Sequence, residues 1–139
     1  MNGQRLFAYG TLRCADIMAE VTGMQGSGVS AVLSGYTCYQ VRNESYPAIA
    51  ACPNGVVQGL LYEDIPPTVW ERLDRFEGGM YIRSTVIVTS RGESIPAQTY
   101  VIADRHRDLL EPVEWNYDCF LRKGKQTFLQ TYPGYRGRR

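Results

Sequence analysis

Runs of β-branched and aromatic residues recur along this chain, and one segment near the middle breaks the pattern. The strand-like runs cover residues 6–9, 32–41, 46–51, 56–63, 81–90 and 95–103. Between residues 66 and 77 the period changes, because Val69, Leu73 and Phe76 share one face of a helix, with Trp70 beside them. Strands and helices therefore do not alternate strictly, which favours an α+β fold over a doubly wound α/β fold.

Turn-forming residues separate the strand-like runs. Gly10 ends the first run, and we expect tight turns at Pro53-Asn54-Gly55 and at Arg91-Gly92-Glu93. Residues 15–21 carry a weak helical pattern that fades into a glycine-rich loop, and aromatic residues between 115 and 129 indicate helical packing near the C-terminus. The sequence thus predicts about five or six strands and about two or three helices.

Length and charge restrict the domain count and the kinds of partner. A chain of 139 residues suits one domain, which we place at residues 1–133, followed by a flexible basic tail at 134–139. The formal net charge is +1, so no global field favours nucleic acid or an anionic membrane as a partner. No stretch reaches the roughly 20 apolar residues that a bilayer crossing needs. We therefore expect a cytoplasmic protein with a small-molecule partner; the sequence carries no signal for an oligomeric state.

Cysteine and histidine give no sign of a metal site or cofactor. The four cysteines are irregularly spaced and form no C-x-x-C pair, so we interpret them as reduced structural thiols. His106 is the only histidine and lies in a polar run that resembles a solvated loop. A histidine-based metal cluster is thus excluded.

Glu77 is the carboxylate that stands out. On the helical wheel it lies beside Trp70 and Leu73, at the edge of the apolar face, and it ends the helix before two glycines. Burial among apolar neighbours would raise its pKa toward neutrality, as a group that both takes and gives a proton requires. The alternative is a helix-terminal glutamate paired with Arg83 or Arg13.

A second candidate is the loop Tyr9-Gly10-Thr11-Leu12-Arg13, which follows the first strand. Glycine there would let consecutive backbone N–H groups point at an anionic or carbonyl oxygen. The pattern matches neither a Walker loop nor a dinucleotide fingerprint, so nucleotide phosphates are not implied. The alternative is an ordinary turn between a strand and a helix.

Taken together, the two segments resemble the paired signatures of the γ-glutamylcyclotransferase-like (AIG2-like) family. The first is Phe7-Ala8-Tyr9-Gly10-Thr11-Leu12-Arg13, and about 65 residues later comes Leu73-Asp74-Arg75-Phe76-Glu77-Gly78-Gly79-Met80-Tyr81-Ile82-Arg83. Further resemblance lies in Gly35-Tyr36, Tyr46-Pro47-Ala48, Val57-Gln58-Gly59-Leu60-Leu61-Tyr62 and Glu114-Trp115-Asn116-Tyr117. The similarity covers nearly the whole chain.

This resemblance implies a small mixed β-barrel flanked by helices, with a cavity between the loop and Glu77. It also implies an enzyme that cyclises a γ-glutamyl group to 5-oxoproline and releases an amine or amino acid, without metal or cofactor. Glu77 would be the general acid and base. The small γ-glutamyl partner would be bound by Tyr9, Gly10, Thr11, Leu12, Arg13, Tyr46 and Tyr81.

The resemblance leaves the leaving group open, since the loop at residues 23–30 has no informative pattern. A different class of function is a non-catalytic protein that uses the same cavity to bind a small ligand, or a stress-associated interaction protein. Glu77 argues against a pure binder, because a half-buried carboxylate facing an anionic ligand adds little affinity. Substitution by glutamine separates the two, since a binder would keep its affinity and an enzyme would lose turnover.

Overall fold

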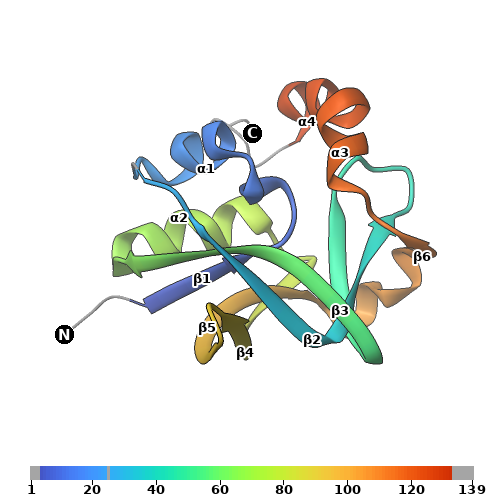
Figure 1. Ribbon diagram of the computed structural model, residues 1–139. Helices are drawn as coiled ribbons and strands as arrows, with labels where there is room; N and C mark the ends of the chain where they lie inside the picture. The colour runs from blue at the N-terminus through green and yellow to red at the C-terminus, as the bar shows by residue number, and fades with distance from the viewer. Residues whose placement is uncertain (1–3, 25, 133–139) are drawn as a thin grey trace.

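Six strands form one mixed sheet that curls around on itself (Figure 1). The computed structural model describes residues 4–24 and 26–132, so the basic tail predicted at 134–139 lies outside the described residues. The elements are β1 (Gln4–Ala8), η1 (Thr11–Arg13), α1 (Ala15–Thr22), β2 (Val29–Val41), β3 (Pro47–Ile65), α2 (Pro67–Glu77), β4 (Tyr81–Ser90), β5 (Glu93–Ile102), η2 (Asp104–Leu109), β6 (Leu110–Glu114), α3 (Tyr117–Cys119), the π-helical turn η3 (Phe120–Gly124) and α4 (Lys125–Thr131).

The strand pairings close into a small barrel. β1 pairs with β3, β3 with β2, β2 with β4, β4 with β5, and β5 returns to β1. Two of these contacts are single residue pairs, Val32 with Thr89 and Leu6 with Gln98. The β1–β5 pair is parallel, whereas the long β2–β3 and β4–β5 pairs are antiparallel. The predicted α+β class and small mixed barrel are thus confirmed, with loose closure at two seams.

The tight turn predicted at Pro53-Asn54-Gly55 is wrong. These residues lie within β3, which runs alongside β2 as one long hairpin. Ser34 pairs with Val56 and Tyr36 pairs with Ala51, so four residues of β3 stand opposite one residue of β2. A Cβ on Gly55 would lie 2.2 Å from the carbonyl oxygen of Tyr36. The turn-forming residues therefore make a bulge, which bends the strand without reversing it.

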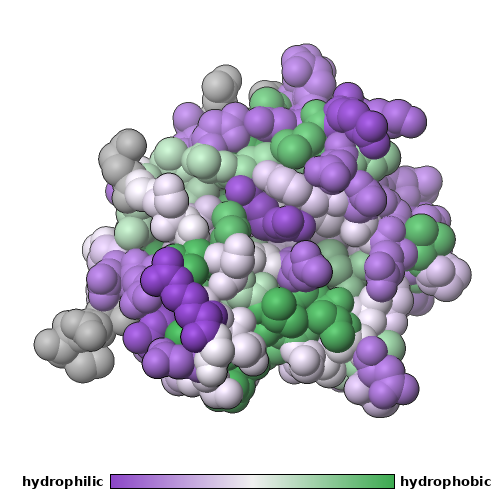
Figure 2. Space-filling model, viewed as in Figure 1, coloured by the Kyte–Doolittle hydropathy of each residue, from purple (hydrophilic) through white to green (hydrophobic). Residues whose placement is uncertain are grey.

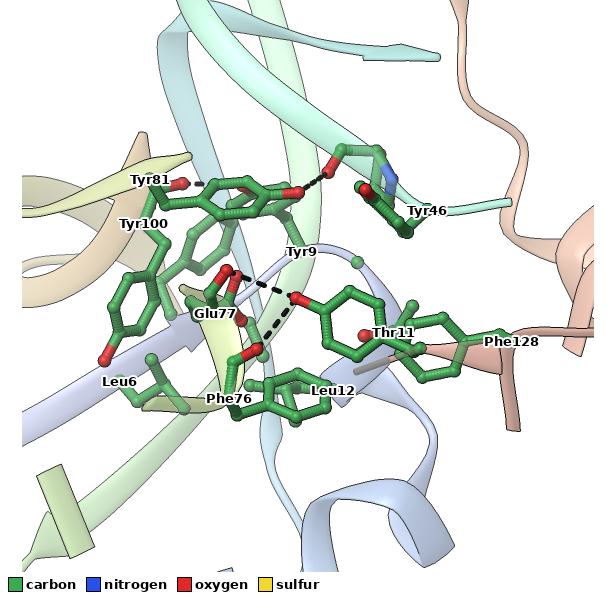
Figure 3. Close-up of a pocket in the computed structure, with 15 residues that line it drawn as sticks. Leu6, Tyr9, Thr11, Leu12, Tyr46, Phe76, Glu77, Tyr81, Tyr100 and Phe128 are labelled. Carbon is green, nitrogen blue, oxygen red and sulfur yellow. Dashed lines mark hydrogen bonds between the residues drawn. The ribbon is translucent and has the colours of Figure 1, made fainter. Parts of the chain in front are cut away.

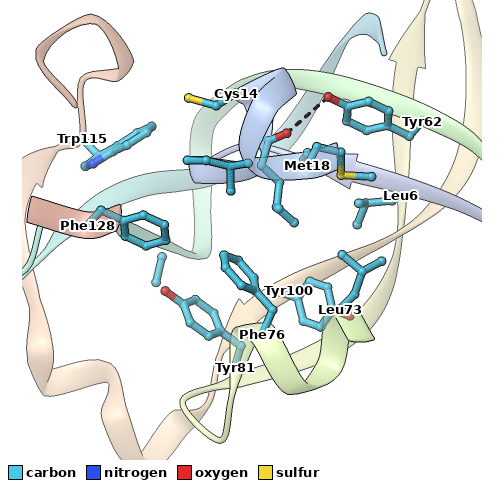
Figure 4. Close-up of a cluster of buried hydrophobic side chains, with 14 of the residues drawn as sticks. Leu6, Cys14, Met18, Tyr62, Leu73, Phe76, Tyr81, Tyr100, Trp115 and Phe128 are labelled. Atoms are coloured by element: carbon cyan, nitrogen blue, oxygen red, sulfur yellow. Dashed lines mark hydrogen bonds between the residues drawn. The ribbon is translucent and has the colours of Figure 1, made fainter. Parts of the chain in front are cut away.

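β1 is buried on both faces, which explains its uninterrupted apolar sequence. Phe7 packs inside the barrel with residues from β2, β3 and β4, whereas Leu6 and Ala8 belong to a second cluster shared with the helices. Figure 4 shows that cluster, in which Leu6, Leu73 and Phe128 come from three different elements. Burial of this kind contributes roughly 25 cal/mol per Å² of apolar surface. The first strand thus joins the barrel to its helical cover.

The labelled α-helices gather on one side of the strands, in the upper part of the view in Figure 1. α1 and α2 confirm the helices predicted near residues 15–21 and 66–77. The β4–β5 hairpin is also confirmed, with a two-residue turn in which Arg91 and Gly92 both have positive φ values of 52° and 79°. Such a turn matches the twist of the paired strands. The sequence had indicated neither β6 nor the π-helical turn η3.

The surface carries some apolar residues. Figure 2 shows hydrophobic side chains gathering below the middle of the face in view, over β2 and β3. Val32 of β2 and Val56 of β3 are among the exposed large hydrophobic residues. Among the described residues, no helix is both long and apolar enough to cross a membrane.

Candidate active site

Helix α2 brings Glu77 to the edge of the helical core. Pro67 begins the helix, and the buried face is formed by Val69, Trp70, Leu73 and Phe76. Glu77 is the last helical residue and is half-buried. Gly78 follows with a φ of 82° and a ψ of −173°, a conformation that favours glycine, and so ends the helix there. The wheel position inferred for Glu77 is therefore the one that the helix adopts.

The loop after β1 forms a short 3₁₀ turn. The N–H of Arg13 donates to the carbonyl of Gly10 at 3.0 Å, which closes the turn. The N–H groups of Thr11 and Leu12 precede this first bond and so have no partner within the turn. Gly10 packs against Pro47, where an added Cβ would lie 2.9 Å from the proline Cγ. Close packing thus holds this loop against the start of β3.

Most residues predicted for the site line one pocket (Figure 3). It encloses about 400 Å³, including its open mouth. Glu77 lies near the middle of the group in Figure 3, with Tyr81 above it and Leu12 below. The predicted residues that line this pocket are Tyr9, Gly10, Thr11, Leu12, Tyr46, Glu77 and Tyr81. Segments about 65 residues apart in sequence therefore meet at a single cavity.

The carboxyl group of Glu77 is strongly perturbed. Burial raises its pKa from the usual 4.5 to about 8, and the nearby negative charge of Asp74 adds to the rise. Both the neutral and the ionised form are thus accessible close to neutral pH, which suits a group that takes and then returns a proton.

Arg83 and Arg13, the two alternative partners considered for Glu77, contact other residues. Arg83 is 3.5 Å from Asp74, and its guanidinium stacks over the ring of Trp70 at 4.7 Å. Arg13 stacks over the ring of Tyr117 at 4.1 Å. Neither cation neutralises the Glu77 carboxylate by an ion pair between the described residues.

Two tyrosine hydroxyls around the pocket are hydrogen-bonded to backbone oxygens. The Tyr9 hydroxyl donates to the backbone oxygen of Tyr100 at 2.5 Å, and the Tyr81 hydroxyl donates to that of Pro47 at 2.7 Å. Burial raises the pKa of both phenols well above 10, and the charge of Glu77 raises them further. Both hydroxyls therefore remain protonated near neutrality, so these two residues shape the pocket without competing for the proton of Glu77.

An aromatic wall faces the carboxylate. Tyr46 makes edge contacts with Phe128 and Tyr132, with ring centroids 6.4 and 5.2 Å away. Burial and the neighbouring Glu44 raise the pKa of Tyr46 to about 12. Phe128 and Tyr132 stack on each other with centroids 4.6 Å apart. Aromatic pairs in these arrangements add about 1 kcal/mol beyond area burial, so this wall is a rigid part of the pocket.

Sequence reasoning missed the role of Tyr132. Its hydroxyl donates to the last carbonyls of α2, at 2.8 Å from that of Phe76 and 3.2 Å from that of Glu77. These carbonyls lack partners within the helix, so the tyrosine satisfies them and fixes the helix end. The aromatic residues near the C-terminus had indicated only helical packing. No spacing rule connects residue 132 to a helix that ends at residue 77.

Arg13 is the predicted site residue that does not line the Glu77 pocket. It stands at the end of η1 and lines a neighbouring pocket together with residues of β3, β6 and the start of α3. Tyr9 lines both pockets. The loop at residues 9–13 thus contributes to two cavities.

Comparison with known proteins links this architecture to plant relatives. AIG2-like protein C of Arabidopsis thaliana is 29% identical over 126 residues, which cover 89% of this chain and 73% of that protein. The solution structure of another Arabidopsis thaliana protein has a TM-score of 0.72 and 26% identity, with 95% of this chain and 89% of the other covered. A structure named gamma-glutamyl cyclotransferase has a TM-score of 0.66 at 18% identity, with 78% and 68% covered, which shows a shared fold.

A family profile matches most of the chain. The profile described as gamma-glutamyl cyclotransferase, AIG2-like, matches residues 6–117. This stretch contains most of β1, the loop at 9–13 and Glu77, whereas Phe128 and Tyr132 lie beyond it. The resemblance that the two sequence segments indicate is thereby confirmed. The chain belongs to the γ-glutamyl cyclotransferase, AIG2-like family.

Proposed function

We propose that this protein cyclises a γ-glutamyl group to 5-oxoproline, with Glu77 as the general acid and base. The observation that carries the proposal is the Glu77 carboxyl, whose pKa is raised to about 8 at a pocket shared with the loop at residues 9–12. Family membership supports the same class of reaction. The relatives named AIG2-like support the family without naming an activity.

In the proposed reaction, the α-amine nitrogen of the γ-glutamyl group attacks its own γ-carbonyl carbon. The Glu77 carboxylate accepts a proton from the amine, and a tetrahedral intermediate forms. Glu77 then returns the proton to the leaving nitrogen as the bond between that nitrogen and the γ-carbon breaks. Ring closure is intramolecular, so correct orientation of the substrate supplies much of the lowering of the barrier.

In this proposal the backbone amides of the loop at residues 9–12 stabilise negative charge on the substrate. The N–H groups of Thr11 and Leu12 are free of partners within the turn, so they can donate to the negative oxygen that develops on the γ-carbonyl, or to the substrate carboxylate. Each such donor is typically worth about 3 kcal/mol of transition-state stabilisation. Tyr9, Tyr46 and Tyr81 would enclose the glutamyl chain, and Gly10 would keep the backbone close to it.

The test is release of 5-oxoproline from a panel of γ-glutamyl amino acids and γ-glutamylamines. Wild type should release product from at least one compound, with a rate that rises with pH until Glu77 is ionised, near its pKa of about 8. Glu77→Gln should lower the rate by about 100-fold or more. Glu71→Gln, on the exposed face of α2, is the matched control and should leave the rate unchanged.

The outcomes separate the proposal from its rival. Loss of turnover in Glu77→Gln, with the control unaffected, would support the cyclotransferase assignment. Equal rates in wild type and Glu77→Gln would refute the role of this carboxyl. If neither protein releases 5-oxoproline from any compound, yet both bind one of them, the pocket would be that of a non-catalytic ligand-binding protein.

A further inference from the structure

A second pocket is lined in part by the same loop that bounds the Glu77 site. It encloses about 640 Å³, including its open mouth, and Tyr9 is the residue that it shares with the first pocket. Among the described residues, its lining combines one cation, Arg13, and one carboxylate, Glu114, with an apolar wall that includes Val57 and Tyr117. The proposed reaction at Glu77 makes no use of these charges.

Stacking holds Arg13 in place without occupying its donors. The guanidinium carbon lies 4.1 Å from the centroid of the Tyr117 ring, so the two planes can share a face. The N–H groups of a guanidinium lie in its plane and point outward from its edges, so a stacked arginine can still bind a carboxylate with two parallel hydrogen bonds. No ion pair between described residues involves Arg13.

Glu114 is fixed at another side of the same pocket. It ends β6 and pairs with Tyr39, and the next residue donates its backbone N–H to the carbonyl of Cys38 at 3.0 Å. Both charges act on the half-buried Cys38 thiol, because burial raises its pKa, Arg13 lowers it and Glu114 raises it. Glu114 takes part in no ion pair between described residues, so it does not pair with Arg13.

Opposite charges that line one cavity without pairing suit a ligand that carries both charges itself. We propose that the second pocket binds a free α-amino acid, whose carboxylate pairs with Arg13 and whose ammonium group pairs with Glu114. The apolar wall favours an uncharged side chain. This inference does not rest on the reaction proposed for Glu77.

The experiment is a titration of the intact protein with leucine near pH 7, followed by calorimetry or by amide chemical shifts. We expect a dissociation constant on the order of 1 mM or tighter. N-acetyl-leucine lacks the ammonium group and leucine amide lacks the carboxylate, so each should bind about tenfold more weakly or worse. Equal binding of leucine and both analogues would overturn the proposal, as would no binding of leucine at about 10 mM.

Substitutions test whether leucine binds in the second pocket. Arg13→Met and Glu114→Gln should each weaken leucine binding about tenfold or more, whereas the matched controls Arg122→Met and Glu111→Gln should bind leucine as wild type does. Both control residues lie outside the pocket. Glu114 is exposed, so Glu114→Gln remains a valid test even if Arg13→Met disturbs folding.

A further variant separates the two pockets. Glu77→Gln should keep leucine binding, because Glu77 lines the first pocket. Loss of leucine binding in Glu77→Gln, combined with full binding in Glu114→Gln, would move the ligand to the first pocket and refute the proposal. The readout is binding and requires no turnover, so it stands or falls separately from the cyclotransferase assay.

Discussion

The buried carboxyl of Glu77 should make the stability of this protein fall as the pH rises toward 8. In the unfolded chain the group has its usual pKa of 4.5, whereas in the folded protein burial and Asp74 raise it to about 8. Below about pH 4.5 both states hold the proton and this group makes no difference. Between 4.5 and 8 the unfolded chain loses the proton and the folded protein keeps it, so ionisation favours unfolding.

The size of the effect follows from these two values. Each pH unit between them changes the free energy of unfolding by about 1.4 kcal/mol, which would give about 4 kcal/mol between pH 5 and 8. Glu77 is only half-buried, so solvent screens part of this, and we expect about 2–4 kcal/mol. The phenols of Tyr9, Tyr81 and Tyr132 have pKa values raised above 10 and do not titrate in this window.

Glu77→Gln isolates this contribution, since glutamine keeps the shape and cannot ionise. Urea unfolding at several pH values between 5 and 8.5 should show wild type losing about 2–4 kcal/mol relative to the variant as the pH rises. Near pH 8 the variant should melt about 7–14 °C above wild type. Glu71→Gln serves as the control and should follow the wild-type curve. Parallel curves for wild type and Glu77→Gln would show that the carboxyl titrates normally and would refute the reasoning.

Three further changes test other parts of the structure. Asp74→Asn removes the second cause of the raised pKa, so an NMR titration of the Glu77 carboxyl should give a lower pKa, and an unchanged value would exclude this coupling. Tyr132→Phe keeps the ring and removes the hydroxyl that is hydrogen-bonded to the end of α2. Urea unfolding should therefore show a free energy of unfolding about 1–2 kcal/mol below that of wild type, and an unchanged value would show that water replaces the hydroxyl without loss. Gly55→Ala drives a Cβ to 2.2 Å from the Tyr36 oxygen, so thermal unfolding should reveal a loss of about 2 kcal/mol or more, and a wild-type melting temperature would contradict this close contact.

Local patterns predicted much of the fold. The helical period between residues 66 and 77 and the turn at 91–93 correspond to α2 and the β4–β5 hairpin. The failure at Pro53-Asn54-Gly55 has a physical cause, because the same residues that form turns also form bulges, and the choice depends on a distant strand. Here β2 supplies that strand and carries Gly35 opposite the extra residues.

Local patterns also predicted some residues of the site and missed others. Glu77 and the loop at 9–12 were accessible because each has a local signature, a helix edge or a glycine after a strand. Tyr132 and Arg83 were not, since their partners depend on how the end of the chain and the barrel pack. A sequence shows that an arginine is present, whereas only packing decides that Arg83 pairs with Asp74 and not with Glu77.

The pocket's first wall residue is Leu6 and its last is Tyr132, so the cavity draws on both ends of the chain. A nascent chain that has emerged only as far as residue 117 would already contain the whole family match, yet it would lack Phe128 and Tyr132. Since domains fold as they are synthesised, from the N-terminus onward, the barrel can assemble while this cavity still lacks one side. Glu77 would then be covered on fewer sides until α4 docks, so Phe128 and Tyr132 would complete the burial that raises the pKa of its carboxyl.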